Sequence, residues 1–154
     1  MSRVLQGDRF NRTKWGGRMM GLARQVSTWS SCPPGRQHAC VLAEDGRFVI
    51  STGYNGPLPG DSKCHCTGMP TEYCKANCKA VHAEVNALRN MPQGHMISRP
   101  LVAYVTKRPC QACFQALFDG GVDELCFAET DGTLVFVLVA SPHLQFTPTP
   151  GWKE

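Results

Sequence analysis

Residues 80–91, AVHAEVNALRNM, and residues 101–118, LVAYVTKRPCQACFQALF, decide the fold of this chain. The first stretch predicts a helix that stops at Pro92, because proline cannot continue a helix. The second stretch predicts a buried strand over 101–105 and a helix over 111–118 that ends at two glycines. A helix, a buried strand and a second helix in this order are typical of a layered α/β domain.

The rest of the chain supplies the other elements of one such domain. Asp-Gly pairs between runs of β-prone residues predict two hairpins. The sequence therefore predicts a three-layer α/β/α domain with a five-stranded mixed sheet, in which the last two strands form an antiparallel hairpin. The remaining expected elements are a helix over 13–29, a hairpin of strands 38–43 and 48–52, and a hairpin of strands 122–129 and 133–140.

The helix expected over 13–29 carries an apolar stripe at spacings of three and four residues, and its glycines weaken it. The stripe consists of Trp15, Met19, Leu22, Ala23 and Val26. Residues 53–81 have almost no periodic apolar pattern, so we expect a cysteine-rich insertion loop there, and residues 141–154 read as a C-terminal tail.

Composition sets the class of protein. The 154 residues, 42% of them hydrophobic, suffice for one globular domain over 1–154 with its own core. No apolar run approaches the roughly 18 residues of a membrane span, and the first residues do not resemble a signal peptide. We therefore expect a soluble protein in a reducing compartment, where nine cysteines favour metal binding over disulfides.

The net charge of +4 is concentrated near the N-terminus, where residues 1–36 hold seven Arg or Lys and one Asp. Such a distribution suits an anionic small substrate or a weak contact with nucleic acid. A basic helix face is more often merely solvated, so charge alone does not identify a partner.

The strongest motif joins His82-Ala83-Glu84 to Pro109-Cys110-Gln111-Ala112-Cys113, with 24 residues between Glu84 and Pro109. Two thiolates and one imidazole make three ligands, which is the number that catalytic zinc takes from protein while one position stays open for water. Zinc lowers the pKa of that water to about 7, and a nearby carboxylate can move its protons. The motif predicts zinc at His82, Cys110 and Cys113, with Glu84 as the proton carrier.

The alternative for this motif is a structural zinc site without catalysis. A structural site normally closes its shell with a fourth Cys or His. Only Cys78 lies within a few residues of either half of the motif. A second alternative is a non-catalytic, zinc-stabilised binding module, but a purely structural site gains nothing from the carboxylate of Glu84.

The H-x-E…P-C-x-x-C arrangement is the known signature of zinc nucleobase deaminases. Residues 15–129 resemble deoxycytidylate (dCMP) deaminases of phage and bacterial type in the cytidine deaminase superfamily, through MMGLA, DGRFVISTGYNG, HAEVNAL and YVTKRPCQAC. The resemblance implies Zn2+ at the motif, Glu84 as proton shuttle, and Asn55 and Ala83 as substrate contacts. Asn-Gly is also a common turn pair, which leaves Asn55 a purely structural reading.

The resemblance also implies a second, structural zinc site in the cysteine-rich region. We expect its ligands to be Cys32, Cys64, Cys74 and Cys78, with Cys66 or His65 as the replacement for Cys64, or else free thiols in a loop. Cys40 and Cys126 lie inside strand patterns and read as small core residues.

Two features depart from the family pattern. His38-Ala39-Cys40-Val41 stands where relatives read close to V-G-A-V, so the first strand is altered beside the site. The antiparallel last strand resembles deaminases of free nucleosides, so phosphate recognition and regulation by nucleotide triphosphates do not follow from the resemblance. Arg36, near the substrate's 5′ end by resemblance, is the candidate phosphate ligand, with an exposed arginine as the alternative.

Together these features predict hydrolytic deamination of dCMP to dUMP. The enzymatic alternative is deamination of free cytidine or deoxycytidine, or of a base in single-stranded nucleic acid. The chain lacks the basic, aromatic-rich patch that would stack bases, which argues against a nucleic-acid substrate. We expect a nucleotide as the small-molecule partner, no membrane contact, a homo-oligomer of unspecified subunit number, and a cytoplasmic location, in the host if the protein is phage-encoded.

Overall fold

The computed structural model describes residues 11–57, 60, 66, 68–139 and 147–148. Its helices are α1 (Arg12–Ser27), α2 (Thr71–Asn77), α3 (Ala83–Arg89) and α4 (Gln111–Asp119). Its strands are β1 (Ala39–Glu44), β2 (Phe48–Tyr54), β3 (Leu101–Val105), β4 (Glu124–Ala128), β5 (Leu134–Leu138) and β6 (Thr147–Pro148).

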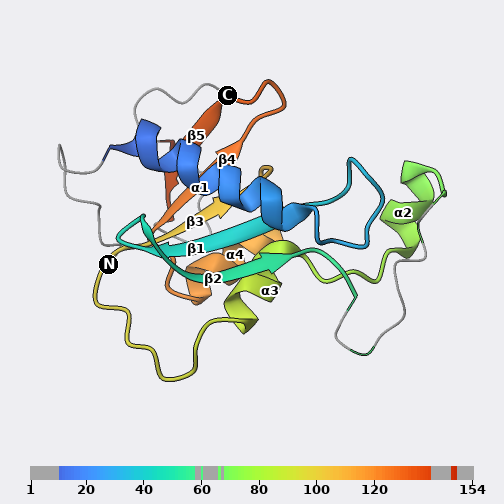
Figure 1. The fold of residues 1–154 in the computed structure, drawn as a ribbon. Coiled ribbons are helices and arrows are strands. Elements are labelled where there is room, and N and C mark those ends of the chain that lie inside the picture. The colour runs from blue at the N-terminus through green and yellow to red at the C-terminus, as the bar shows by residue number, and fades with distance from the viewer. Residues whose placement is uncertain (1–10, 58–59, 61–65, 67, 140–146, 149–154) are drawn as a thin grey trace.

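One mixed sheet with the strand order β2-β1-β3-β4-β5-β6 forms the centre of the fold (Figure 1). Among the described strands, only β3 and β4 are parallel, and α4 provides the crossover between them. The strands β4 and β5 pair as an antiparallel hairpin, as the sequence predicted. All five predicted strands are present, and the two-residue β6 adds a short sixth inside the segment predicted to be a tail.

Helices cover the sheet on both sides and bury different strand residues. On one face, α3 and α4 pack against Cys40, Leu42 and their neighbours. On the other face, α1 packs against Val41, Ala43 and Tyr104. Successive residues of β1 therefore point alternately into the two cores, which explains why its first five residues are all buried. The α/β/α layering predicted from the sequence is confirmed.

The helix α1 presents a slightly different face to the sheet from the predicted one. Met20 is fully buried, whereas Leu22, which the stripe placed in the core, is exposed. Gly16 explains the orientation, since a Cβ there would meet the Phe136 ring at 3.0 Å. Gly16 lowers the helix propensity of α1, but its lack of a side chain lets α1 approach β5 closely.

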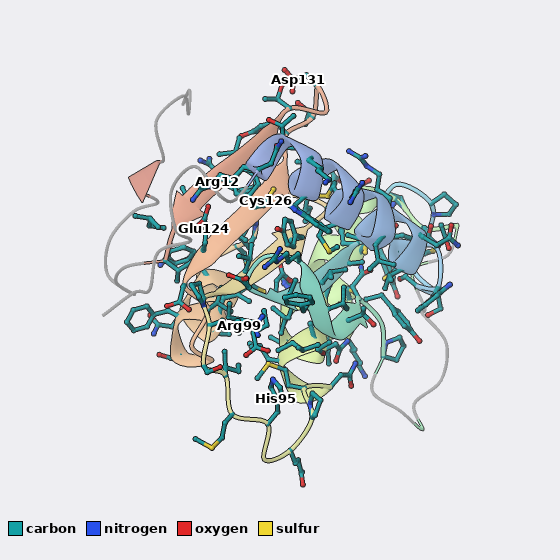
Figure 2. All side chains as sticks on the ribbon, turned by 60° about the vertical axis from the view of Figure 1, so that its left-hand side comes forward. Arg12, His95, Arg99, Glu124, Cys126 and Asp131 are labelled. Atoms are coloured by element: carbon teal, nitrogen blue, oxygen red, sulfur yellow. The ribbon has the colours of Figure 1, made fainter. Side chains whose placement is uncertain are left out.

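An ion pair fixes the start of α1 to the sheet. Arg12 donates from Nε to Glu124 Oε1 at 2.8 Å and from Nη2 to Oε2 at 3.2 Å. Figure 2 shows the two side chains facing each other between α1 and β4. Glu124 is fully buried, so this bidentate pair satisfies a carboxylate that would otherwise be costly to bury.

The segment predicted as an insertion loop contains two ordered features. The helix α2 follows Pro70 and carries Glu72 in its first turn, two helix-start signals that do not depend on apolar periodicity. Gly56 and Val81 form an isolated antiparallel bridge that closes the base of the loop. None of the helices in the described part of the chain is long and apolar enough to cross a membrane.

Candidate metal centre and active site

Two helix N-termini bring the predicted catalytic ligands together. His82 is the N-cap of α3 and follows Val81, which the bridge to Gly56 holds in place. Cys110 is the N-cap of α4, and its sulfur accepts a hydrogen bond from the backbone N–H of Cys113 at 3.5 Å. The partial positive charge at both helix starts favours thiolates and an anionic ligand at this point.

The distances within this cluster fit a tetrahedral zinc ion. His82 Nδ1 lies 3.2 Å from Cys113 Sγ and 3.6 Å from Cys110 Sγ. Zn–S bonds of about 2.3 Å and Zn–N bonds of about 2.0–2.1 Å at a tetrahedral angle would put such atoms roughly 3.5 Å apart. All three ligand atoms lie within 4.8 Å of one another. The donor set and spacing therefore fit zinc with one coordination position left for another ligand.

Glu84 lies in the first turn of α3 and is only 5% exposed. Burial raises the pKa of the Cys113 thiol above its ordinary value, and the Glu84 carboxylate raises it further. If both thiols lost their protons, Glu84, Cys110 and Cys113 would place three negative charges close together, which is unfavourable without a cation. A metal ion bound at the cluster would instead favour the deprotonated thiols, because a thiol that coordinates a metal loses its proton.

Comparisons with known proteins agree with this chemistry. The family model described as the cytidine and deoxycytidylate deaminase zinc-binding region matches residues 13–129. The chain belongs to this deaminase family. A relative named deoxycytidylate deaminase, from Mycobacterium phage D29, is 30% identical over 127 residues, which cover 76% of this chain and 96% of the relative. The mouse deoxycytidylate deaminase is 25% identical, with 96% of this chain and 88% of that protein covered.

The fold of this deaminase matches that of solved relatives. The apo structure of a dCMP deaminase from the cyanophage S-TIM5 has a TM-score of 0.61 and 24% sequence identity. The match covers 77% of this chain and 86% of that protein. The likeness confirms the cytidine deaminase-like fold that the sequence predicted.

The deaminase also has a second cluster of thiols. The sulfur atoms of Cys66, Cys74 and Cys78 lie within 4.8 Å of one another, and Cys78 Sγ accepts a hydrogen bond from Ala80 N at 3.4 Å. Cys66 is the replacement that the sequence offered for Cys64. Cys64 and His65 lie outside the described residues. The buried Cys32 falls outside the group of three, and its sulfur lies 3.3 Å from Asn55 Nδ2.

Asn55 makes hydrogen bonds to the chain that leads into β1. Its Nδ2 donates to Arg36 O at 2.7 Å, and its Oδ1 accepts from His38 N at 2.8 Å. These bonds hold the segment 36–38 against the end of β2. The structural reading of Asn55 therefore has direct contacts in its favour, and its role as a substrate contact stays a prediction.

Arg36 lies beside the second thiol cluster. Its Nη2 donates to Met69 O at 3.0 Å and to Thr71 Oγ1 at 3.2 Å, which ties the loop before β1 to the start of α2. Desolvation alone would raise the pKa of the Cys74 thiol, but interactions with Cys66, Arg36 and Cys78 lower it. The arginine is thus half-buried and engaged, in contrast to the exposed arginine considered as the alternative.

The sequence placed the segment that begins at His38 beside the site but gave His38 itself no role. His38 directly precedes β1, and its Nδ1 lies 3.5 Å from Thr106 Oγ1. The available signal was its period-two spacing from Cys40, which places both side chains on the same side of the strand. Cys40 and Cys126 themselves are fully buried core residues, as predicted.

Proposed function

We propose that this protein catalyses the hydrolytic deamination of dCMP to dUMP with release of ammonia, a reaction of pyrimidine nucleotide metabolism. The observation that carries the proposal is the buried Glu84 beside the cluster of His82, Cys110 and Cys113. The resemblance to the phage deoxycytidylate deaminase over most of both chains supports the nucleotide as substrate.

His82, Cys110 and Cys113 would hold the zinc ion. Zinc bound by three protein ligands acidifies water and so provides a nucleophile near neutral pH. Glu84 accepts a proton from the water that attacks C4 of cytosine and delivers it to the ring nitrogen N3. The same carboxylate carries the second proton to the amino group, so that the C4–N bond breaks with ammonia as the leaving group. A carbonyl remains at C4, and atoms balance as dCMP plus water giving dUMP plus ammonia.

Three further residues belong to the proposed substrate site. Ala83 directly follows His82 and is buried in the first turn of α3, and Asn55 directly follows the end of β2. Arg36 remains the candidate for the 5′-phosphate, because its Nη1 is buried and has no hydrogen-bond partner among the residues that the structure describes. If it holds the phosphate, Arg36→Ala lowers kcat/KM for dCMP and hardly changes it for deoxycytidine.

A second candidate is a deaminase of free cytidine or deoxycytidine. The antiparallel pairing of β4 with β5 favours it, since that arrangement is the one expected of nucleoside deaminases. Ammonia release measured with dCMP, deoxycytidine, cytidine, dCTP and single-stranded DNA separates these possibilities. Preferential turnover of dCMP supports the proposal, and equal or better turnover of a free nucleoside contradicts it.

We also infer a structural zinc ion at Cys66, Cys74 and Cys78, with the fourth ligand supplied by Cys32 or Cys64. The closeness of three thiols in a segment without an apolar core supports this ion. The homo-oligomer expected from the sequence stays a prediction, which light scattering of the purified protein tests.

A further inference from the structure

His38 lies on the catalytic side of the sheet. In β1, the residues Cys40 and Leu42 point toward α3 and α4, while Val41 and Ala43 point toward α1. His38 stands two residues before Cys40, and its backbone continues the ladder, because its carbonyl accepts from Asn55 N at 3.1 Å. Its side chain therefore falls on the face at which α3 and α4 begin, and these helix starts carry the metal ligands.

The contacts of His38 agree with this placement. Its ring lies beside Thr106, which begins the connection from β3 to Cys110. The charges of Lys107 and His82 are close enough to act on the imidazole electrostatically. The ring is thus close to the segment that leads to Cys110 and within electrostatic reach of His82.

Hydrogen bonds hold His38 in place and leave its Nδ1 beside the hydroxyl of Thr106. Its backbone N–H donates to Asn55 Oδ1 at 2.8 Å. Thr106 Oγ1 accepts from Ala39 N at 3.1 Å, so the hydroxyl proton is free to point toward His38 Nδ1. When the hydroxyl donates to Nδ1, Nε2 carries the ring proton and is a donor.

The imidazole is neutral at physiological pH. Burial lowers the pKa of His38 to about 4, and the positive charge of Lys107 adds to this effect. A neutral ring offers one N–H donor and an aromatic face, but no charge to attract a phosphate. Its chemistry therefore suits the uncharged part of a nucleotide.

We propose that His38 is a specificity-determining residue that contacts the nucleoside part of the substrate next to the metal ligands. The proposal rests on the proposed function, because it takes a cytosine nucleotide as the ligand. His38 is also the first residue of the segment in which this chain departs from the pattern of the family it resembles. The contact would thus be a feature of this chain in particular.

The test compares His38→Val, which removes the ring and its donor, with His38→Gln, which keeps an N–H donor on a flexible side chain. His95→Val in the exposed loop before β3 is the matched control, and Arg36→Ala is the comparator for the phosphate end. For every variant, kcat and KM are measured with dCMP and with deoxycytidine, together with zinc content.

We expect His38→Val to lower kcat/KM about three- to tenfold for dCMP and by the same factor for deoxycytidine, as loss of one neutral hydrogen bond implies. Zinc content should stay at the parental value, and His38→Gln should recover part of the loss. Unchanged kcat/KM for both substrates overturns the proposal. A decrease confined to dCMP does so too, because the contact would then be to the phosphate, and loss of zinc would indicate a purely structural role.

The same measurements test the proposed function separately from the role of His38. If the parent prefers deoxycytidine or cytidine to dCMP, the nucleotide assignment is wrong, but the effect of His38→Val is still measured on the nucleoside. If the parent deaminates no cytosine compound, both proposals are overturned.

Discussion

Glu84 is buried beside two thiols, an environment in which a lone carboxylate is unfavourable. The thiol of Cys40, buried on the neighbouring strand, has a raised pKa, first because of burial and then because of Glu84. The position of Glu84 is therefore best explained by proton transfer at the metal cluster.

Glu84→Gln should abolish turnover while zinc stays bound, because the amide keeps the size of the side chain but cannot accept the proton. Loss of a general acid–base group typically lowers the rate about 10²- to 10⁴-fold. Steady-state assays and metal analysis of the same preparation check this. Loss of zinc together with activity would show instead that Glu84 is a ligand or a requirement for folding.

His38 should make the protein sensitive to mild acid. Its pKa is about 4 when folded, lowered by burial, Lys107 and His82, against an ordinary value of 6.5. As pH falls from 6.5 toward 4, the unfolded chain binds a proton at this residue before the folded chain does, so stability decreases over that window. His38→Gln should therefore lose less thermal stability than the parent between pH 7 and pH 5. Melting curves at matched zinc content decide this, and parallel pH profiles would contradict it.

The ion pair of Arg12 and Glu124 joins the helix α1 to the strand β4. It differs from a surface ion pair because the Glu124 side chain is fully buried. Arg12→Ala leaves that carboxylate without its partner, and we expect a loss of about 1.5–3 kcal/mol in the free energy of unfolding. Arg47→Ala, which removes an exposed pair with Asp45, is the control and should change stability by less than about 1 kcal/mol. Urea unfolding of both variants gives the comparison. Equal effects would show that burial of Glu124 is not decisive.

Contact between β2 and α3 requires a residue without a side chain at Gly53. A Cβ there would collide with the backbone nitrogen of Ala87 and lie 2.6 Å from the carbonyl oxygen of Ala83. Gly53→Ala should push α3 away from the sheet and displace His82 and Glu84.

We expect Gly53→Ala to lower stability by about 1–3 kcal/mol, as overpacking does, and to reduce zinc binding and activity together. Gly56→Ala is the control, since nothing lies within 4 Å of its Cβ position. Thermal unfolding and metal content are the measurements. A Gly53→Ala protein with parental values of both would contradict the argument.

Helices and strands with a clear pattern of apolar residues or turn signals could be predicted from the sequence. Elements without such a pattern could not. The strand Leu101–Val105 agrees with the prediction to the residue, because it is a short apolar run between turn signals. The hairpin turn at Asp45 and Gly46 was also predicted, and both residues have positive φ angles as a type I′ turn requires. In contrast, α2 has no apolar stripe, so periodicity could not reveal it.

For the molecule as a whole, the sequence predicted which residues form the catalytic cluster but not how other loops approach it. His82, Cys110 and Cys113 were identifiable because two helix starts flank one strand, which brings them to the same edge of the sheet. The environments of His38 and Arg36 depend on how the chain enters β1, and tertiary hydrogen bonds to Asn55, Met69 and Thr71 fix that path. No local pattern encodes those bonds.

The two thiol-containing clusters lie at different places in the molecule, and we predict that each binds one zinc ion. The catalytic cluster joins α3 to α4, whereas Cys66, Cys74 and Cys78 join α2 to the preceding segment. In Figure 1, α2 stands at the periphery, away from the sheet, and neither core cluster of the described residues includes a residue of α2. We therefore expect metal binding to stabilise this region, since the free energy of binding contributes directly to folding.

Metal-replete protein should accordingly contain about two zinc ions per chain, and Cys74→Ser should contain about one. This variant should also unfold at a lower temperature, because the remaining ligands cannot close a tetrahedral shell, yet it should keep the catalytic ion. Cys126→Ser, a substitution in the core, is the control and should keep two ions even if its stability falls. Parallel Cys32→Ser and Cys64→Ser variants identify which thiol supplies the fourth ligand. A stoichiometry near one in the replete parent would remove the second site, and α2 would then depend on contacts such as those of Arg36 with Met69 and Thr71.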